Sequence, residues 1–317
     1  MTELSLPPDK PMHEEHPELM HYTTADGLNG IVSSKTLWAT HAGFLNDSEE
    51  VIGFFSNRLG MILKPELQRH VPESLEQCLA EFLAAFRKAQ EQTQDHYVTS
   101  FCTACDEWVS QNGLLSQWRG YGQDGGYAIV FDTKGLDSLL RNDAGHYHDS
   151  EETLVFGDVQ YDEGVEGLSF VRDKQILNHL QSVRDSFAEC LKGEGPWEDY
   201  KAFDSVAVLS TFWKHRGFNE EREVRIVIGE PSPKTQRELA NEVTTPFRKI
   251  YAFARDGIAV PCIHLFEDQE LETLPIRRII VGPHLDKEKR RKAVEILLKN
   301  HGIDADVMVS ATPFRGR

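Results

Sequence analysis

The sequence predicts an α+β fold with a mixed, mostly antiparallel sheet at its core and helical insertions. Three observations lead to this class. The 317 residues are enough for a large core, and 40% of them are hydrophobic. Short β-rich runs and amphipathic helical windows follow one another irregularly, without the regular alternation typical of a parallel sheet. No internal repeat is visible in the chain.

Residues 1–17 are rich in Pro and Glu and have no apolar periodicity, which predicts a mobile lead-in. The fold then begins with a short strand over 19–23. Thr24 is placed to cap a helix over 26–33, whose apolar residues share one face. A second strand follows over 37–40.

The remaining elements follow from the same patterns. Apolar residues at three- and four-residue spacing predict an amphipathic helix over 72–94 and two further helices over about 170–191 and 197–215. Short β-rich runs predict strands over 97–102, 127–131, 222–228, 276–282 and 305–309. A polar loop is expected over 141–155 and a helix over 286–300. We expect one domain over 18–311, with helical insertions near 56–95 and 165–216 and a short tail over 312–317.

Composition restricts the partners and the cellular compartment that we expect for the protein. The chain carries 51 acidic and 34 basic residues, so its formal net charge is −17. A net negative charge does not favour nucleic acid or an anionic membrane as a general partner, because both are negatively charged. It is still compatible with a basic groove at one place on the surface. No apolar run is long enough to span a bilayer, and the five cysteines are too few and scattered for a disulfide framework. We therefore expect a cytoplasmic protein with reduced thiols and no membrane partner.

Gly120 to Gly125 satisfies the G-x-G-x-x-G pattern of dinucleotide-binding folds, but a strand follows where that fold needs a helix. A flexible turn is the simpler interpretation. Trp118, Arg119 and Tyr121 offer a third one, because aromatic rings beside a guanidinium can line a pocket for a ring or a phosphate.

Metal-binding patterns are weak. Cys102 and Cys105 form a single C-x-x-C pair with no second pair at zinc-site spacing. The histidine pairs His13/His16 and His146/His148 lie in polar segments and are interpreted as surface residues. No metal cofactor is expected.

The most informative segment runs from Phe218 to Arg225. If it is a strand, Glu221, Glu223 and Arg225 share one face, with the two carboxylates about 7 Å apart. Such a row can bind a polyol or a cation, or stabilise positive charge that develops at a sugar carbon. The alternative is the solvated face of an edge strand.

Two positions near the start of the fold are ambiguous. His21 lies in the first strand, where a lone histidine is commonly structural. Asn46 and Asp47 are most simply a turn, since both side chains can bond their own backbone.

These pieces resemble the bacterial domain-of-unknown-function family 2971 over about residues 19–300. The resemblance is carried by spaced N-D, W-x-x-Y and E-x-E-x-R elements: Asn46-Asp47, Ser100-Phe-Cys, Trp118-Arg-Gly-Tyr121, Phe212-Trp-Lys214 and Glu221-Arg-Glu-Val-Arg225. Ser48 and Phe218 depart from the family's usual Pro and Trp. Because the family is itself uncharacterised, the resemblance implies a fold but does not specify a reaction.

The opening His-Tyr-Thr strand, the short helix and Leu37-Trp are also similar to the start of NAD-dependent ADP-ribosyltransferases of the toxin type. That resemblance implies a split sheet, which pairs a first-strand His or Arg with a middle-strand Ser or Tyr and a late-strand Glu. The substrate would be NAD.

The same resemblance implies roles for individual residues. His21 would bond the ribose or the nicotinamide amide of NAD, and Glu223 would hold the ribose 2′-hydroxyl and stabilise the oxocarbenium-like centre. Glu221 would orient the acceptor. The other implied contacts are nicotinamide stacking by Tyr22 or Tyr121 and a pyrophosphate bond from Arg225 or Arg119.

Two further groups of residues could bind a ligand independently of this resemblance. A positive mouth on the acidic surface would bind a dinucleotide or nucleic acid, and it would consist of Arg119, Lys214, Arg216 and Arg225. An aromatic cluster of Trp118, Tyr121 and Tyr127 would bind a ligand or a partner.

Three hypotheses follow. The first is an NAD-dependent ADP-ribosyltransferase-like enzyme, of the toxin or phage-defence type, that modifies a protein or nucleic-acid acceptor. The second is a non-enzymatic ligand-sensing or protein-interaction module. The third is a metal-dependent nuclease or hydrolase built on Asp47, Glu221 and Glu223.

Overall fold

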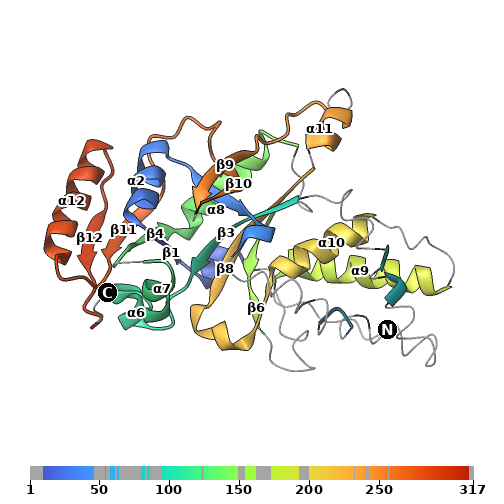
Figure 1. Cartoon of the computed structure of the whole chain (residues 1–317), viewed down its shortest axis with the longest axis horizontal. Coiled ribbons are helices and arrows are strands. Elements are labelled where there is room, and N and C mark those ends of the chain that lie inside the picture. Colours follow the sequence, from blue (N-terminus) through green and yellow to red (C-terminus); the bar gives the residue numbers. More distant parts are fainter. Residues whose placement is uncertain are drawn as a thin grey trace.

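The chain folds into a large sheet covered by helices on both faces, which confirms the predicted α+β class (Figure 1). The computed structural model describes residues 10–45, 95–122, 125–148, 154–161, 173–192, 200–231, 233–239, 241, 243–255 and 257–313, with short pieces between 54 and 85. The predicted helix over 72–94 falls largely outside these residues. Asn46 and Asp47 also lie outside them.

Among the described residues, ten strands form the main sheet. They are β1 (Glu18–Thr23), β2 (Leu37–His41), β3 (Asp95–Cys102), β4 (Tyr127–Asp132), β5 (Leu154–Asp158), β8 (Glu223–Glu230), β9 (Tyr251–Arg255), β10 (Ile258–Leu265), β11 (Ile276–Val281) and β12 (Asp306–Val309). Among the described strands of this sheet, neighbours pair antiparallel except β11 and β12, which are parallel and are joined through α12 (Lys287–Asn300). Two short strands, β6 (Gln160–Tyr161) and β7 (Trp213–Lys214), pair separately.

The sheet divides at β3. Strand β8 pairs with one edge of β3 over its whole length, from Asp95 to Cys102. The other edge is shared, because β1 pairs at Cys102 and β2 pairs at Tyr97 and Val98. Strands β1 and β2 therefore leave β3 at opposite ends, and the segment 99–101 lies between them.

Helices cover the two faces separately. The first face packs against α2 (Ala25–Ser34), α8 (Thr133–Ala144) and α12. The opposite face packs against α9 (Lys174–Lys192) and α10 (Tyr200–Thr211) in one part, and against α6 (Glu107–Asn112) and α7 (Leu115–Gly120) in another. In Figure 1, α9 and α10 lie at one end of the molecule, while α12 and α2 lie at the other.

Strand alternation explains why these apolar clusters are distinct. Successive side chains of a strand point to opposite faces. In β8, Val224 and Ile226 belong to the cluster on the first face, whereas Val227 belongs to the α9/α10 cluster on the second. Glu223 and Arg225 alternate with Val224 and therefore occupy the second face too.

Several expectations about local structure were confirmed. The strands near 19–23, 37–40, 97–102 and 127–131 are present as β1 to β4, and the terminal strand, helix and strand are present as β11, α12 and β12. The helices expected near 170–191 and 197–215 correspond to α9 and α10, although Trp213 and Lys214 form β7.

Other expectations were wrong. The polar loop over 141–155 is shorter, because α8 continues to Ala144 and β5 begins at Leu154. Asp143 made this stretch look like a loop, but it is buried in an ion pair with Arg248 at 2.6 Å. A charged residue can be buried when an oppositely charged partner pairs with it, but the sequence alone does not reveal that partner.

The N-terminal segment also differs from expectation. Residues 10–17 include a short helix, α1 (Met12–Glu15), which contacts α8 and whose Met12 packs against the first apolar cluster. Among the described helices, none combines the length and apolar character that crossing a membrane requires.

Candidate functional site

The His21 side chain is fixed by the backbone of β3. Its Nδ1 lies 3.0 Å from the carbonyl oxygen of Ser100, and because a carbonyl only accepts, Nδ1 carries the proton. Burial lowers the pKa of His21, against the opposing effect of this hydrogen bond. The ring is therefore neutral at neutral pH, and its Nε2 is an acceptor.

Ser100 lies between His21 and Glu223. Its carbonyl accepts from His21, and its side chain is close enough to the Glu223 carboxylate to help lower the pKa of that group. The three residues lie on the neighbouring strands β1, β3 and β8, at the place where β1 and β2 separate. Among the predicted site residues Ser100 was missing, although the middle-strand Ser that the transferase resemblance implies was a signal for it.

His21 and Glu223 approach Ser100 from opposite faces of the sheet. His21 pairs with Ile129 and contacts Phe101 edge to face, and both partners belong to the apolar cluster of the first face. Glu223 pairs with Cys102, which belongs to a cluster of the second face. A ligand that touches both groups therefore has to reach across the interval at 99–101.

Glu223 belongs to a buried ion cluster, which consists of Lys214, Glu221, Glu223 and Arg225. Arg225 donates from Nε to one Glu223 oxygen at 2.6 Å and from Nη2 to the other at 3.0 Å. Lys214 Nζ lies 2.8 Å from Glu221 and 3.2 Å from Glu223. All four residues are buried, and their two positive and two negative charges balance.

The ion cluster differs from the predicted row of side chains. Strand β8 begins only at Glu223, whereas Glu221 ends a 3-10 helix, η4 (Arg216–Glu221). Between them, Arg222 adopts a left-handed conformation with φ of 42°. The two carboxylates lie together because both contact Lys214. The sequence had predicted that residue spacing along a single strand would bring them together. The alternative of a solvated edge strand was also wrong, because every residue of β8 is buried.

The cations of the ion cluster keep Glu223 ionised. Burial alone would raise the pKa of this carboxyl group, but the charges of Arg225 and Lys214 outweigh burial and lower it to about 2. Glu223 is thus a permanent anion at neutral pH, which is the state needed to stabilise developing positive charge.

The predicted aromatic cluster is divided between core and surface. Trp118 is fully buried, donates from Nε1 to the Asn112 carbonyl and packs edge to face on Tyr22. The Tyr22 hydroxyl accepts from the Leu114 amide at 2.7 Å. These two rings fill the core in this structure, so neither face is presented to a ligand. Tyr121 is 39% exposed, and Arg119 is also exposed.

A hollow of about 320 Å³ opens beside Glu223. The hydroxyl of Tyr161, at its wall, accepts from the Glu223 amide at 2.8 Å. The lining residues are Glu15, His16, Thr103, Asp158, Val159, Gln160, Tyr161, Asp173, Arg222 and Glu223.

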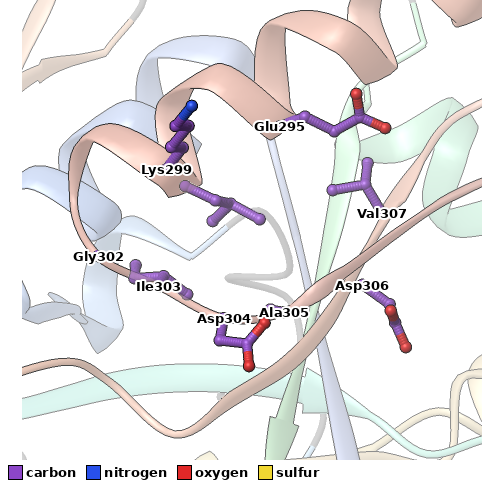
Figure 2. A pocket seen from close by; sticks show the side chains of 9 residues that line it. Glu295, Lys299, Gly302, Ile303, Asp304, Ala305, Asp306 and Val307 are labelled. Atoms are coloured by element: carbon purple, nitrogen blue, oxygen red, sulfur yellow. The ribbon is translucent and has the colours of Figure 1, made fainter.

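A second hollow, of about 580 Å³, lies between α12 and β12 (Figure 2). Figure 2 shows Glu295 and Lys299 of the helix opposite Asp306 and Val307 of the strand. It contains none of the predicted site residues.

Cys102 is buried and Cys105 is exposed, so the two thiols of the C-x-x-C pair have different environments. Burial raises the pKa of the Cys102 thiol well above its ordinary value. The glycine-rich turn precedes β4, which confirms that no helix follows it as a dinucleotide-binding motif requires.

Comparison with known protein families finds a match over part of the chain. Residues 117–226 match the family model described as "Protein of unknown function (DUF2971)". Over this segment the chain is similar to DUF2971 proteins. The segment contains Trp118, Lys214 and the whole ion cluster, whereas His21 and Ser100 lie before it, and it is shorter than the stretch of 19–300 expected from the sequence. No curated protein and no solved structure matches the chain.

Proposed function

We propose that the protein is an NAD-consuming enzyme of the ADP-ribosyltransferase type, which transfers ADP-ribose to a protein or nucleic-acid acceptor. The observation that carries the proposal is the position of Ser100, whose carbonyl accepts from His21 and whose side chain lies beside Glu223, where it helps to lower the pKa of that carboxyl group. First-strand His, middle-strand Ser and late-strand Glu are thereby neighbours at a divided sheet.

Each residue has a chemical task in this proposal. The neutral His21 accepts a hydrogen bond at Nε2 from the nicotinamide amide or a ribose hydroxyl. The ionised Glu223 accepts from the ribose 2′-hydroxyl and stabilises the cationic sugar carbon. The C1′–N bond breaks, its electron pair leaves with nicotinamide, and the acceptor nucleophile forms the new bond to C1′ while losing its proton to solvent.

The contacts of the ion cluster support the following proposals for the remaining residues. Arg225 is occupied by Glu223 and by the Thr211 carbonyl, so the pyrophosphate contact falls to Arg119. Glu221 contacts Lys214 and would orient the acceptor from the edge of the ion cluster. Tyr121 is the exposed ring that would stack on nicotinamide. Such an activity suits a toxin or phage-defence effector, because modification of one macromolecule can stop growth.

The test supplies NAD labelled in its adenylate half to the folded protein together with cell extract. We expect nicotinamide release and transfer of label to a macromolecule, with both lost in Ser100→Ala and His21→Ala. Glu189→Gln, an exposed change on α9, is the matched control and should keep both. Absence of release and transfer from protein shown to be folded would overturn the proposal.

The second candidate, a ligand-sensing module, is favoured by one observation. The ion cluster is balanced by its own members, as a structural network would be. This candidate predicts that NAD or ADP-ribose raises the melting temperature without any nicotinamide release. The metal-dependent hydrolase is less well supported, because Glu221 and Glu223 are both paired with cations.

A further inference from the structure

We propose that Glu15, His16 and Asp158 bind one divalent transition-metal cation at the hollow beside Glu223. One ligand atom from each residue lies within 4.8 Å of the other two. Glu15 and His16 come from the end of α1 and the residue after it, and Asp158 ends β5, so the set joins segments 142 residues apart.

The donor set determines the class of ion. One imidazole nitrogen and two carboxylate oxygens suit Mn²⁺, Fe²⁺, Co²⁺ or Zn²⁺ better than Mg²⁺ or Ca²⁺, which prefer oxygen alone. His16 Nε2 lies 2.8 Å from Asp158 Oδ1. A cation would replace this hydrogen bond with two metal–ligand bonds.

The hollow provides a second observation. All three residues line it, as do Asp173 and Arg222. The Asp173 carboxylate accepts from the amides of Gln175 and Ile176, and the charge of Glu223 is balanced by Arg225 within the ion cluster. The ligand atoms of Glu15, His16 and Asp158 therefore gather at the wall of a hollow that is open to a bound ion.

The position of the set gives the ion room for its remaining ligands. Three protein ligands leave open coordination positions on a four- to six-coordinate metal. Those positions would face the hollow of about 320 Å³ and could be filled by water or by an oxygen of a bound molecule. The proposal does not depend on NAD chemistry, and it assigns a metal where the sequence predicted only a surface histidine.

The experiment titrates MnCl₂ and, separately, ZnCl₂ into the full, metal-free chain by calorimetry, with manganese followed in parallel by electron paramagnetic resonance. We expect one equivalent to bind. His16→Ala and Asp158→Asn should each weaken binding more than about tenfold, since even groups that only support a metal ligand commonly matter that much.

His146→Ala and Asp304→Asn are the matched controls, because both residues are exposed and lie outside the donor set. Both should bind metal as the unchanged protein does. Absence of saturable binding by either metal would overturn the proposal, and so would binding that His16→Ala leaves unchanged. Neither result depends on whether NAD is consumed, so this proposal and the proposed function fail separately.

Discussion

Arg225 holds both carboxylate oxygens of Glu223, with Nε 2.6 Å from one and Nη2 3.0 Å from the other. This two-point contact fixes the orientation of the carboxylate as well as its charge. The amide of Glu223 is held in turn by Tyr161. Glu223 is therefore preorganised, whether its function is to stabilise a sugar cation or to anchor the ion cluster.

Lys214→Met should destabilise the fold by about 3–5 kcal/mol, because it leaves Glu221 and Glu223 buried without their shared cation. Urea unfolding measures the loss. The double variant Lys214→Met/Glu221→Gln should recover part of it, since one unpaired charge is removed. A loss below about 1 kcal/mol would show that the ion cluster is not needed for stability.

Glu223 should make stability dependent on acid pH. Its folded pKa of about 2 lies below the ordinary value of 4.5, so its contribution is complete above about pH 4.5 and is lost as pH falls through about 2. The free energy of unfolding should therefore fall more between about pH 5 and about pH 3 in the unchanged protein than in Glu223→Gln/Arg225→Met. Equal falls in the two proteins would contradict this pKa.

Gly113→Ala should destabilise the protein by about 2–4 kcal/mol, combining backbone strain and overpacking. Gly113 has a φ of 72°, and an added Cβ would collide with the Trp118 ring. Gly120→Ala is the control, because a Cβ there meets nothing within 4 Å. Thermal unfolding compares the two. Similar melting temperatures would mean that Trp118 can move, and its assignment as a fixed core residue would fail.

Tyr121→Ala should change the free energy of unfolding by no more than about 0.5 kcal/mol, since the ring is 39% exposed. If this ring stacks on nicotinamide, NAD binding should weaken about tenfold. Trp108→Ala, at a ring 56% exposed on α6, should leave NAD binding unchanged. Calorimetric titration with NAD measures both affinities. An affinity for NAD that Tyr121→Ala leaves unchanged would show that Tyr121 is not part of the site.

The sequence predicted most strands and helices whose apolar residues repeat clearly. The stripe of Phe203, Val206 and Leu209 is buried as its spacing indicated. Buried polar residues misled the prediction. Asp143 looked like loop sequence because its partner Arg248 is distant in the chain, and neither periodicity nor propensity detects such a pair.

The candidate site could be predicted in part. Glu223 does contact both Arg225 and Lys214. The segment that ends at Glu221 is a 3-10 helix, however, whereas a continuous strand was expected there. The left-handed Arg222 has no sequence signal, since this conformation is rare outside glycine. The strand alternation that puts His21 and Glu223 on opposite faces depends on the pairing of β1 with β3, which a single sequence does not specify.

The proposed chemistry is tested most directly by the rate of nicotinamide release from NAD, measured by chromatography for the unchanged protein, Ser100→Ala and Glu189→Gln. Ser100→Ala removes one hydroxyl and leaves the four charges of the ion cluster in place, so the fold should survive. The account predicts release by the unchanged protein and by Glu189→Gln, and a rate at least about tenfold lower in Ser100→Ala. Equal rates in all three folded proteins, or no release by any of them, would contradict it.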